Sequence, residues 1–413
     1  MTKAPGIEDI FPDRIDRWNH VVNSARKAFR RFNIREIIIP VLEFTEVFAR
    51  GIGDETDIVS KEMFTFEDRG GRSLTLRPEG TAGVVRAYCE NGEYNRLSIA
   101  KFFYIGPMFR AEKPQKGRLR QFNQLGAEIF GSDDPFHDAE IITLIDTIAK
   151  DTGISDYTVL INSIGCSECR PAFIEELRKY YDSHQNELCE DCKRRLTKNT
   201  LRLLDCKNEG CKALREHAPK ISGHLCKDCS DHYTAVKNHL EAAGIGYTED
   251  HFLVRGLDYY CKTTFEFVTN ALGGQNAFAA GGRYNKLVET FGGKPTPAVG
   301  FAAGIERILL ITEAQKVNES RLDAYLVHAG DKAREKSYEI LRGLRAKGLS
   351  ADIDPSSTGM KSQMKKAERD RSRYAIIIGD AEIEGGFAMV KNMDTGNQEK
   401  IPFDAIADAI EPA

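Results

Sequence analysis

Apolar and polar positions alternate over residues 120–130, and this run predicts a β-strand with one polar face. An apolar run over residues 101–110 precedes it. The loop between the two runs is rich in Lys, Gly, Pro and Arg, a pattern typical of an antiparallel hairpin. A repeat of two places five residues on one face of the second strand: Arg120, Phe122, Gln124, Gly126 and Glu128.

This polar face has two interpretations. The solvated side of an antiparallel hairpin is commonly polar, and the alternation alone favours that interpretation. The same face also suits an anionic ligand with an aromatic base, with phosphate on an arginine and the base on Phe122. Arg110 ends the first run beside it, and the loop adds Lys113, Lys116 and Arg118. The motifs described below favour the second interpretation.

Hydrophobic periodicity predicts the other elements of the first 310 residues. Helices are expected at 13–33, from Thr81 onward, at 137–150 and at 231–243. Strands are expected at 37–39, 63–66, 73–77, 157–163 and around Phe265 and Phe267. Residues 279–287 predict a Gly-rich turn into a helix, and residues 298–310 predict a strand followed by a helix.

The pattern changes after a polar stretch at 313–321, which we interpret as a linker. Strands and helices then alternate, which predicts a small α/β domain with a mixed sheet. The expected elements are strand 323–328, helix 331–347, strand 350–353, helix 359–372, strand 374–378 and a terminal hairpin and helix. Helix 359–372 is strongly basic. A solvated helix face explains that charge, and contact with RNA phosphate is the alternative.

Composition narrows the class of protein. The 413 residues, 41% hydrophobic and 29% charged, suit a globular chain of about two to four domains. A net charge of -4 means that any nucleic-acid binding must use local basic patches. No apolar run approaches the length of a membrane span, and the N-terminus lacks the apolar core of a signal peptide. We therefore expect a cytoplasmic enzyme.

Eight of the ten cysteines lie between residues 166 and 229 in four close pairs, three of them with CxxC spacing. In a chain expected to be cytosolic, such pairs favour a structural zinc site, since each supplies two thiolates of a tetrahedron. Two sites, one site with four spare thiols, or eight reduced thiols are the alternatives. We expect zinc on Cys189, Cys192, Cys226 and Cys229, with Cys166, Cys169, Cys206 and Cys211 as the alternative second set.

Five sequence motifs carry a resemblance to a known family. GPMFRAE followed by GRLRQFNQLGAE resembles motif 2 of class II aminoacyl-tRNA synthetases, in the form found in histidyl-tRNA synthetases. LRPEGT is similar to the amino-acid-binding segment of that family, and RGLDYY and AAGGRYNKL resemble its two specific signatures. AVGFAAGIERILL resembles motif 3. The resemblance runs from residue 1 to about residue 405, so it is far more specific than one short motif.

The resemblance implies an α+β fold, with an antiparallel catalytic sheet flanked by helices. Residues 1–165 and 246–313 would form this class II core. Residues 166–245 would form a Cys-rich insertion domain against the tRNA acceptor arm, and residues 322–413 an α/β anticodon-binding domain. The region around residues 13–40 resembles motif 1, which implies a homodimer.

The resemblance also implies an activity. Such an enzyme activates L-histidine with ATP and Mg²⁺, then transfers the histidyl group to the 3′ end of tRNA(His). Arg255, Arg110 and Arg307 would be catalytic, since cations stabilise negative charge on the phosphates. Histidine would be bound by Glu79, Thr81, Arg110, Gln124, Glu128, Arg255, Tyr259 and Tyr260. ATP would be bound by Arg110, Glu112, Arg120, Phe122 and Arg307, and tRNA by Lys113, Gln115, Lys116 and Arg118.

Two other classes of protein compete with this interpretation. A non-catalytic regulatory paralogue would bind histidine and partner a phosphoribosyltransferase, but such paralogues generally lack RGLDYY and the anticodon domain. An RNA-binding or zinc-scaffold protein would make the active-site residues incidental. Capping of the helix at Thr81 and a buried ion pair at Arg307 are the purely structural explanations of those two positions.

Overall fold

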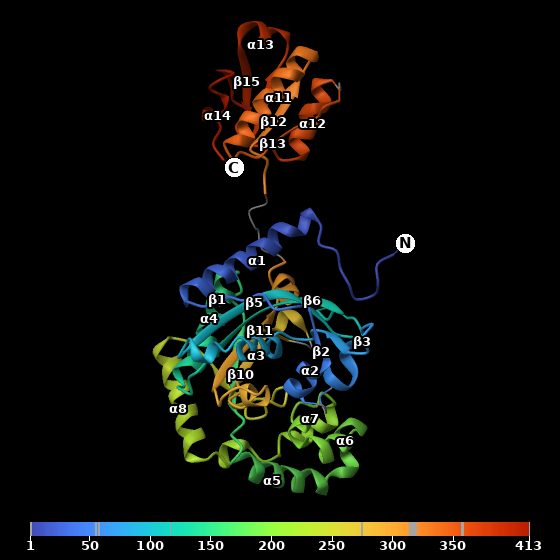
Figure 1. Cartoon of the computed structure of the whole chain (residues 1–413), viewed down its shortest axis with the longest axis vertical. Coiled ribbons are helices and arrows are strands. Elements are labelled where there is room, and N and C mark those ends of the chain that lie inside the picture. Colours follow the sequence, from blue (N-terminus) through green and yellow to red (C-terminus); the bar gives the residue numbers. More distant parts are fainter. Residues whose placement is uncertain are drawn as a thin grey trace. The chain divides into compact units, whose positions relative to one another are not determined.

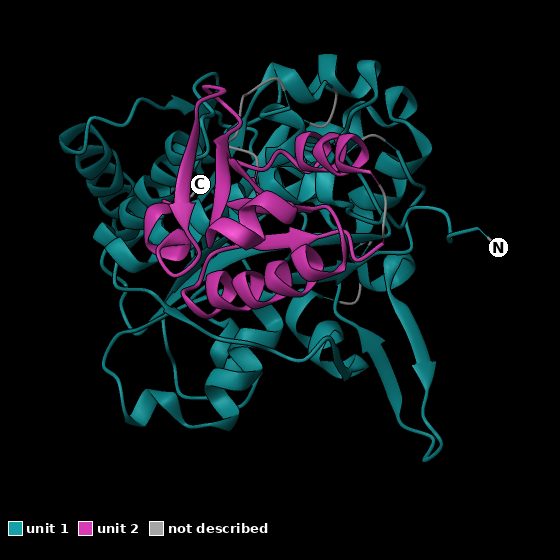
Figure 2. Ribbon diagram, turned by 90° about the horizontal axis from the view of Figure 1, so that it is seen from above, with its two compact units in different colours: residues 1–317 teal, residues 318–413 magenta. Residues whose placement is uncertain are grey.

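The computed structural model describes residues 2–412 except 54–55, 57, 116, 274–275, 314–319 and 357–358. The chain divides into two compact units, residues 1–317 and 318–413 (Figure 2). The expected fold class is confirmed: an antiparallel sheet flanked by helices, followed by a separate α/β unit. The polar linker expected at 313–321 falls largely on residues outside the described ranges.

An eight-stranded sheet forms the centre of the first unit (Figure 1). Its order is β1 (Arg35–Glu36), β5 (Ala100–Phe109), β6 (Gln121–Phe130), β11 (Ala298–Gly304), β10 (Ala277–Arg283), β9 (Cys261–Val268), β7 (Thr158–Ser163) and β8 (Thr248–Glu249). The six inner strands are antiparallel, while the short edge strands β1 and β8 run parallel to their neighbours. The expected hairpin of residues 101–130 is confirmed as β5 and β6.

Helices cover one face of this sheet with an apolar core. They are α1 (Pro12–Arg31), α4 (Phe136–Asp151), α8 (Lys227–Ala242) and α10 (Ile305–Ile311). Phe29 of α1 stacks on Phe103 of β5 with ring centroids 4.2 Å apart. The odd-numbered residues Leu125, Ala127 and Ile129 of β6 belong to this core. The even-numbered residues therefore face the other side, as the alternation predicts.

The other face of the sheet carries α3 (Thr81–Glu90), α2 (Thr45–Ile52), α9 (Leu287–Thr290) and a π-helical turn at Ile58–Glu62. A three-stranded sheet of β2 (Leu42–Phe44), β4 (Ser73–Leu76) and β3 (Phe64–Glu67) adjoins it. Between β7 and β8 the chain forms α5 (Arg170–Ser183), α6 (Glu190–Lys198), α7 (Glu209–Arg215) and α8 (Figure 1). These four helices fall within residues 166–245, the expected insertion.

The second unit has a mixed five-stranded sheet, as the alternating pattern predicts. The order is β13 (Ala351–Ile353), β12 (Ala324–His328), β14 (Tyr374–Ile378), β15 (Phe387–Asn392) and β16 (Gln398–Pro402). The first three strands are parallel and the last two are antiparallel. Its helices are α11 (Asp331–Ala346), α12 (Met360–Arg369), α13 (Asp380–Gly385) and α14 (Ile406–Ala409). Within the described ranges, no helix is long and apolar enough to cross a membrane.

Two local predictions were wrong. Residues 37–39 are not a strand. Strand β1 ends at Glu36, and only one further hydrogen bond to β5 follows among the described residues, from Ile37 N–H to the Phe103 carbonyl. Ile38 is 90% exposed. Residues 279–283 are not a turn but part of strand β10. Gly281 lies directly against β11, where a Cβ would overlap the carbonyl oxygen of Gly300. The glycines there permit close strand packing rather than a turn.

Candidate active site

One cavity of about 350 Å³ brings together most of the residues expected to bind substrate. Strands β6, β9, β10 and β11, helix α10 and the segment 254–260 form its walls. The predicted residues that line it are Glu79, Thr81, Arg110, Glu112, Arg118, Phe122, Gln124, Arg255, Tyr259, Tyr260 and Arg307. Residues distant in the sequence thus meet at the polar face of β6.

Glu79 and Thr81 lie at the start of α3. The Glu79 carboxylate accepts the backbone N–H groups of Thr81 at 2.6 Å and Ala82 at 2.8 Å, so the side chain does cap the helix. It also lines the cavity while only 4% exposed. Burial raises the pKa of the Glu79 carboxyl. A positively charged group entering the cavity would offset this cost of burying an anion.

Glu128 is fully buried below these residues and does not itself line the cavity. Its carboxylate accepts the Thr81 hydroxyl at 2.7 Å and the hydroxyl of Tyr284. Burial raises the pKa of Glu128 to about 8. The neighbouring strand makes room for the carboxylate, since a Cβ at Gly300 would overlap it. Tyr284 is the tyrosine of AAGGRYNKL, and the sequence did not predict its hydrogen bond to Glu128.

Three tyrosines form an aromatic wall. The rings of Tyr259 and Tyr260 lie 4.5 Å apart, and Tyr284 meets both nearly edge-on. The Tyr259 hydroxyl donates to the Tyr260 hydroxyl at 3.5 Å. A flat ring with polar nitrogen atoms fits such a wall, because hydroxyl groups are available next to apolar ring faces.

Arg255 pairs with a residue that the sequence analysis missed. Its guanidinium forms an ion pair with Glu266 of β9 and lies 5.9 Å from the ring centroid of Tyr260. Arg255 Nε is buried and has no hydrogen-bond partner in the described structure. Burial raises the pKa of Glu266. Glu266 is the one acidic residue in the run TTFEFV, between Phe265 and Phe267, and this was the available signal.

Further cations line the cavity. Arg110 lies 5.2 Å from the ring centroid of Phe122, and its Nε–H donates to the Pro78 carbonyl at 3.0 Å. Arg307 donates to the backbone carbonyls of Gly117 and Ala277. Burial lowers the pKa of Arg110. Burial, followed by the positive charges of Arg118 and Arg110, lowers the pKa of Arg307. Clustered cations of this kind favour a polyanionic ligand.

The described loop residues among these predictions lie partly at the cavity and partly outside it. Arg118 both lines the cavity and pairs with Glu112 at 2.9 Å, while Arg120 donates to the Glu112 carbonyl at 3.2 Å without lining it. Lys113 and Gln115 are exposed. Lys116 lies outside the described residues.

Comparisons with known proteins agree with this geometry. The family model described as histidyl-tRNA synthetase matches residues 6–308, and the model of an anticodon binding domain matches residues 323–412. The chain belongs to the histidyl-tRNA synthetase family. The histidine--tRNA ligase of Halothermothrix orenii is 51% identical over 404 residues, covering 97% of this chain and 96% of that protein.

Two further relatives cover the synthetase over its full length. The histidine--tRNA ligase of Thermotoga petrophila is 47% identical over 411 residues, covering 99% of this chain and 97% of that protein. The crystal structure of apo S. aureus histidyl-tRNA synthetase superposes with a TM-score of 0.84 at 37% identity, covering 99% of this chain and all of that one. The synthetase family is therefore supported by sequence and fold together.

The thiol groups of this synthetase form two clusters of four that differ from the predicted sets. One cluster contains Cys166, Cys169, Cys226 and Cys229, and the other contains Cys189, Cys192, Cys206 and Cys211. The expected grouping of Cys189 and Cys192 with Cys226 and Cys229 was wrong. Helix α8 packs on α4 and on β9, the neighbour of β7 in the sheet, so its first turn meets the residues that follow β7. The spacing within each pair does not specify this long-range meeting.

Both clusters have the dimensions of a tetrathiolate site. The Sγ atom of Cys166 lies 3.8 Å from the Sγ atoms of Cys169 and Cys226. The Sγ atoms of Cys189 and Cys206 are also 3.8 Å apart. With Zn–S distances of about 2.3 Å, a tetrahedron of sulfur atoms has edges of about 3.8 Å. Backbone N–H groups point at sulfur as well, Glu168 at Cys166 and Cys189 at Cys211. Both donor sets fit Zn²⁺.

The signature residue Arg283 has a structural role in this synthetase. It is fully buried and pairs with the buried Asp138, which also contacts His232 of the insertion. The insertion supplies Asp205 and Lys207 to the cavity wall, on either side of Cys206. The sequence analysis missed this contribution, because no motif marks it.

Replacing Gly300 with Ala should impair histidine binding, because the new Cβ would displace the Glu128 carboxylate. We expect the KM for histidine in ATP–pyrophosphate exchange to rise about tenfold or more, with destabilisation of about 1–3 kcal/mol from overpacking. Gly246→Ala is the matched control, since its Cβ would meet open space. An unchanged KM for histidine in Gly300→Ala would contradict the proposed role of Glu128.

Proposed function

We propose that the cavity is the site where histidine and ATP react, with histidine at the tyrosine wall and ATP at the arginine cluster. The enzyme forms histidyl-adenylate and pyrophosphate, then transfers the histidyl group to the 3′ end of tRNA(His) with release of AMP. The observation that carries the proposal is one cavity lined by the buried Glu79 carboxylate, by two tyrosines and by a cluster of arginines.

Histidine is held by groups that complement each of its parts. Glu79 and Thr81 take the ammonium group, because a buried carboxylate with a raised pKa gains from a cation. Arg255, Arg110 and Gln124 lie toward the amino-acid carboxylate, and the Gln124 Oε1 is buried without a partner in the described structure. Tyr260 and Tyr259 face the imidazole nitrogens, and the buried Glu128 acts behind this wall through its bonds to Thr81 and Tyr284. An amino acid without these nitrogens leaves buried polar groups unpaired, which gives strong discrimination.

ATP is held by stacking and by charge. The adenine stacks on Phe122 beside Arg110, with Glu112 and Arg120 at that end of the site. Arg307 orients the triphosphate. Carboxylates of the cavity wall, which include Glu112, Glu266 and Glu306, would hold the Mg²⁺ that accompanies ATP. Bound Mg²⁺ supplies charge neutralisation on the phosphates.

The first reaction is an in-line displacement at the α-phosphate. A carboxylate oxygen of histidine attacks phosphorus and pyrophosphate leaves with the bonding electrons, while Arg110 and Arg255 stabilise the developing negative charge. In the second reaction a terminal ribose hydroxyl of tRNA attacks the carbonyl carbon, and AMP leaves. The loop with Lys113, Gln115, Lys116 and Arg118 contacts the tRNA end. The exposed basic residues of α12 offer a second RNA contact in the anticodon-binding unit.

A regulatory paralogue without catalysis is the competing function. It is disfavoured because the RGLDYY residues Arg255, Tyr259 and Tyr260 line the cavity, and because the second unit matches the anticodon-binding model.

Arg255→Ala should abolish most histidine-dependent ATP–pyrophosphate exchange. We expect kcat to fall about 100- to 1000-fold, since one cation on the transition state is lost. Arg255→Lys keeps the charge next to Glu266, so it separates loss of catalysis from an unpaired buried carboxylate. Arg96→Ala, at an exposed arginine paired with Glu93, is the control and should match wild type. Wild-type protein that binds histidine without exchange would support the regulatory paralogue instead.

We propose a homodimer formed through the three-stranded sheet. One face of this sheet carries hydroxyl groups, with the buried Thr75 bonded to Thr45 and Thr65. Its other face is apolar and exposed, with Phe44 and Phe66 on either side of Leu74. A sheet that exposes its apolar face lacks a cover. A second copy of the chain is the proposed cover.

Phe44→Asp should shift the enzyme from dimer to monomer in sedimentation-velocity ultracentrifugation, because a carboxylate cannot be buried in an apolar interface without large cost. Arg69→Asp is the matched control, because Arg69 lies at the exposed tip of the β3–β4 hairpin in the same sheet. It should leave the dimer intact. Wild-type protein that sediments as a monomer at micromolar concentration would contradict the proposed interface.

We also propose that each thiol cluster binds one structural Zn²⁺. Four thiolates fill the tetrahedron and leave no open position for water, so zinc would act in folding rather than in catalysis. A reducing compartment keeps such thiols available for metal, and we therefore propose the cytoplasm as the location.

Metal analysis of purified enzyme should find two zinc ions per chain. Cys189→Ser and Cys226→Ser should each lose one, because every cluster needs its four ligands. The double variant distinguishes the pairings: the structural grouping predicts loss of both ions, whereas a site of Cys189, Cys192, Cys226 and Cys229 predicts loss of only one. Cys89→Ser, outside both clusters, is the control. Absence of zinc from wild-type enzyme would refute the assignment.

A further inference from the structure

The segment 255–260 that supplies Arg255, Tyr259 and Tyr260 has little backbone structure of its own. It belongs to no helix or strand. Within the described ranges, its backbone makes one hydrogen bond to other backbone, from Asp258 N–H to the Ile52 carbonyl at 3.3 Å. A segment near a ligand that lacks such bonds must be positioned by side chains of its surroundings.

Arg170 supplies such a contact to Tyr260. Its Nη2 donates to the Tyr260 carbonyl at 2.7 Å and to the Gly165 carbonyl at 3.1 Å, while its Nε–H donates to the Ile164 carbonyl at 3.0 Å. One planar guanidinium therefore joins the end of β7 to the residue that would recognise histidine. Only arginine presents donors in this fixed fork. Arg170 directly follows Cys169 of the first thiol cluster.

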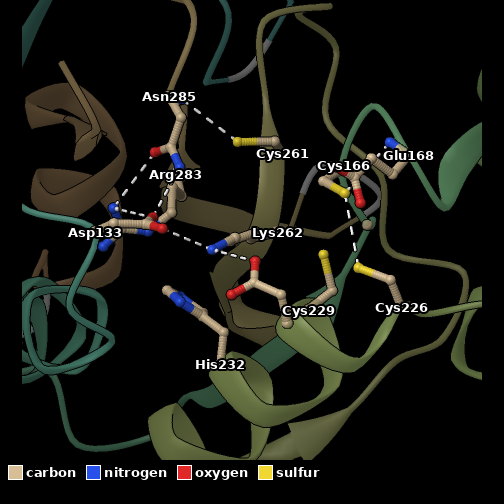
Figure 3. Close-up of polar contacts among 12 residues, drawn as sticks. Asp133, Cys166, Glu168, Cys226, Cys229, His232, Cys261, Lys262, Arg283 and Asn285 are labelled. Atoms are coloured by element: carbon tan, nitrogen blue, oxygen red, sulfur yellow. Dashed lines mark hydrogen bonds and ion pairs between the residues drawn. The ribbon is translucent and has the colours of Figure 1, made fainter. Parts of the chain in front are cut away.

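Lys262, two residues after Tyr260, forms a second link to this cluster. It is 4% exposed, and its Nζ lies 2.8 Å from a carboxylate oxygen of Asp133 and 2.9 Å from one of Asp228. Asp228 stands between Cys226 and Cys229, the other half of the same cluster. Figure 3 shows Lys262 between Asp133 and the helix that carries Cys229. The Lys262 backbone also pairs with Ile164 and Gly165, at 2.8 Å in both directions.

The two halves of the first cluster therefore both reach the short stretch of residues 260–262. The Cys166 and Cys169 half acts through Arg170, and the Cys226 and Cys229 half acts through Asp228. Contacts between the two halves include Cys166 with Cys226, which Figure 3 shows, and Cys169 with Cys229, both at 3.8 Å. Thiols are weak hydrogen-bonding groups, so without a metal these sulfur contacts would hold the halves loosely.

We propose that the first thiol cluster, with zinc bound, sets the affinity for histidine by positioning Tyr260 through Arg170 and Lys262. Arg170 is a positioning residue: it touches the Tyr260 backbone and none of the proposed contacts to substrate. The inference rests on the proposed zinc site and histidine site. It predicts that damage to this link weakens histidine binding while leaving ATP binding nearly intact, because the arginine cluster around ATP lies on α10 and on the loop between β5 and β6.

Arg170→Gln, Arg170→Lys and Asp228→Asn test the link. Calorimetric titration with histidine in the absence of ATP gives the Kd, pyrophosphate exchange gives KM for histidine and for ATP, and metal analysis gives zinc content. We expect Kd and KM for histidine to rise about tenfold in Arg170→Gln, as for loss of one well-placed hydrogen bond, with KM for ATP within about twofold of wild type. Arg170→Lys should recover part of the affinity, because it can still donate to one carbonyl.

Arg178→Gln, an exposed arginine on the same helix α5, is the matched control and should match wild type throughout. Removing zinc from wild-type enzyme with a chelator should raise the Kd for histidine as Arg170→Gln does. Two zinc ions with an unchanged Kd for histidine in Arg170→Gln would overturn the inference alone, as would an equal rise in KM for ATP. Wild-type enzyme without zinc would overturn the metal assignment, whatever the Arg170 variants show.

Discussion

The burial of the Glu128 carboxylate is the constraint around which the catalytic sheet is arranged. A carboxylate in the interior is costly unless it is hydrogen-bonded, and here α3 supplies the Thr81 hydroxyl and the end of β10 supplies Tyr284. The neighbouring strand contributes Gly300, because any larger residue would occupy the volume of the carboxylate. Three sequence-distant elements are thus committed to one buried group. Glu128 accordingly fixes how α3, β10 and β11 meet, and with them the floor of the cavity.

The same electrostatic logic extends to the substrate groups. Glu79 is a buried anion with a raised pKa, whereas Arg110 and Arg307 are half-buried cations with lowered pKa values. Each departs from its ordinary pKa in the direction that an opposite charge would reverse. A zwitterionic amino acid and a polyphosphate supply those opposite charges. The cavity is therefore electrostatically preorganised, and binding energy is available where charge develops during the displacement.

Local periodicity predicted much of this arrangement, because strands and helices impose their own repeats. The hairpin of β5 and β6 and the shared face of Phe122, Gln124 and Glu128 follow from a period of two. The motifs then identified Arg110, Arg255 and Arg307 as neighbours, which no periodicity provides. Glu266 was missed because its importance depends on a cross-sheet partner. The glycines at 281 and 282 were assigned to a turn because permissive backbone and close strand packing have the same sequence signal.

The grouping of the cysteines shows most clearly which features the sequence does not determine. CxxC spacing fixes the distance within a pair, but the path of the chain through α5, α6 and α7 decides which pairs meet. That path also brings the insertion to the cavity wall. Cys206 lies between Asp205 and Lys207, which line the cavity, and Arg202 donates to the Gly256 carbonyl at 3.1 Å. The second cluster thus supports the wall near Gly256, while the first supports Tyr260. An insertion built around two compact thiol clusters can brace an irregular substrate-binding segment from both ends, which few backbone hydrogen bonds would otherwise hold in place.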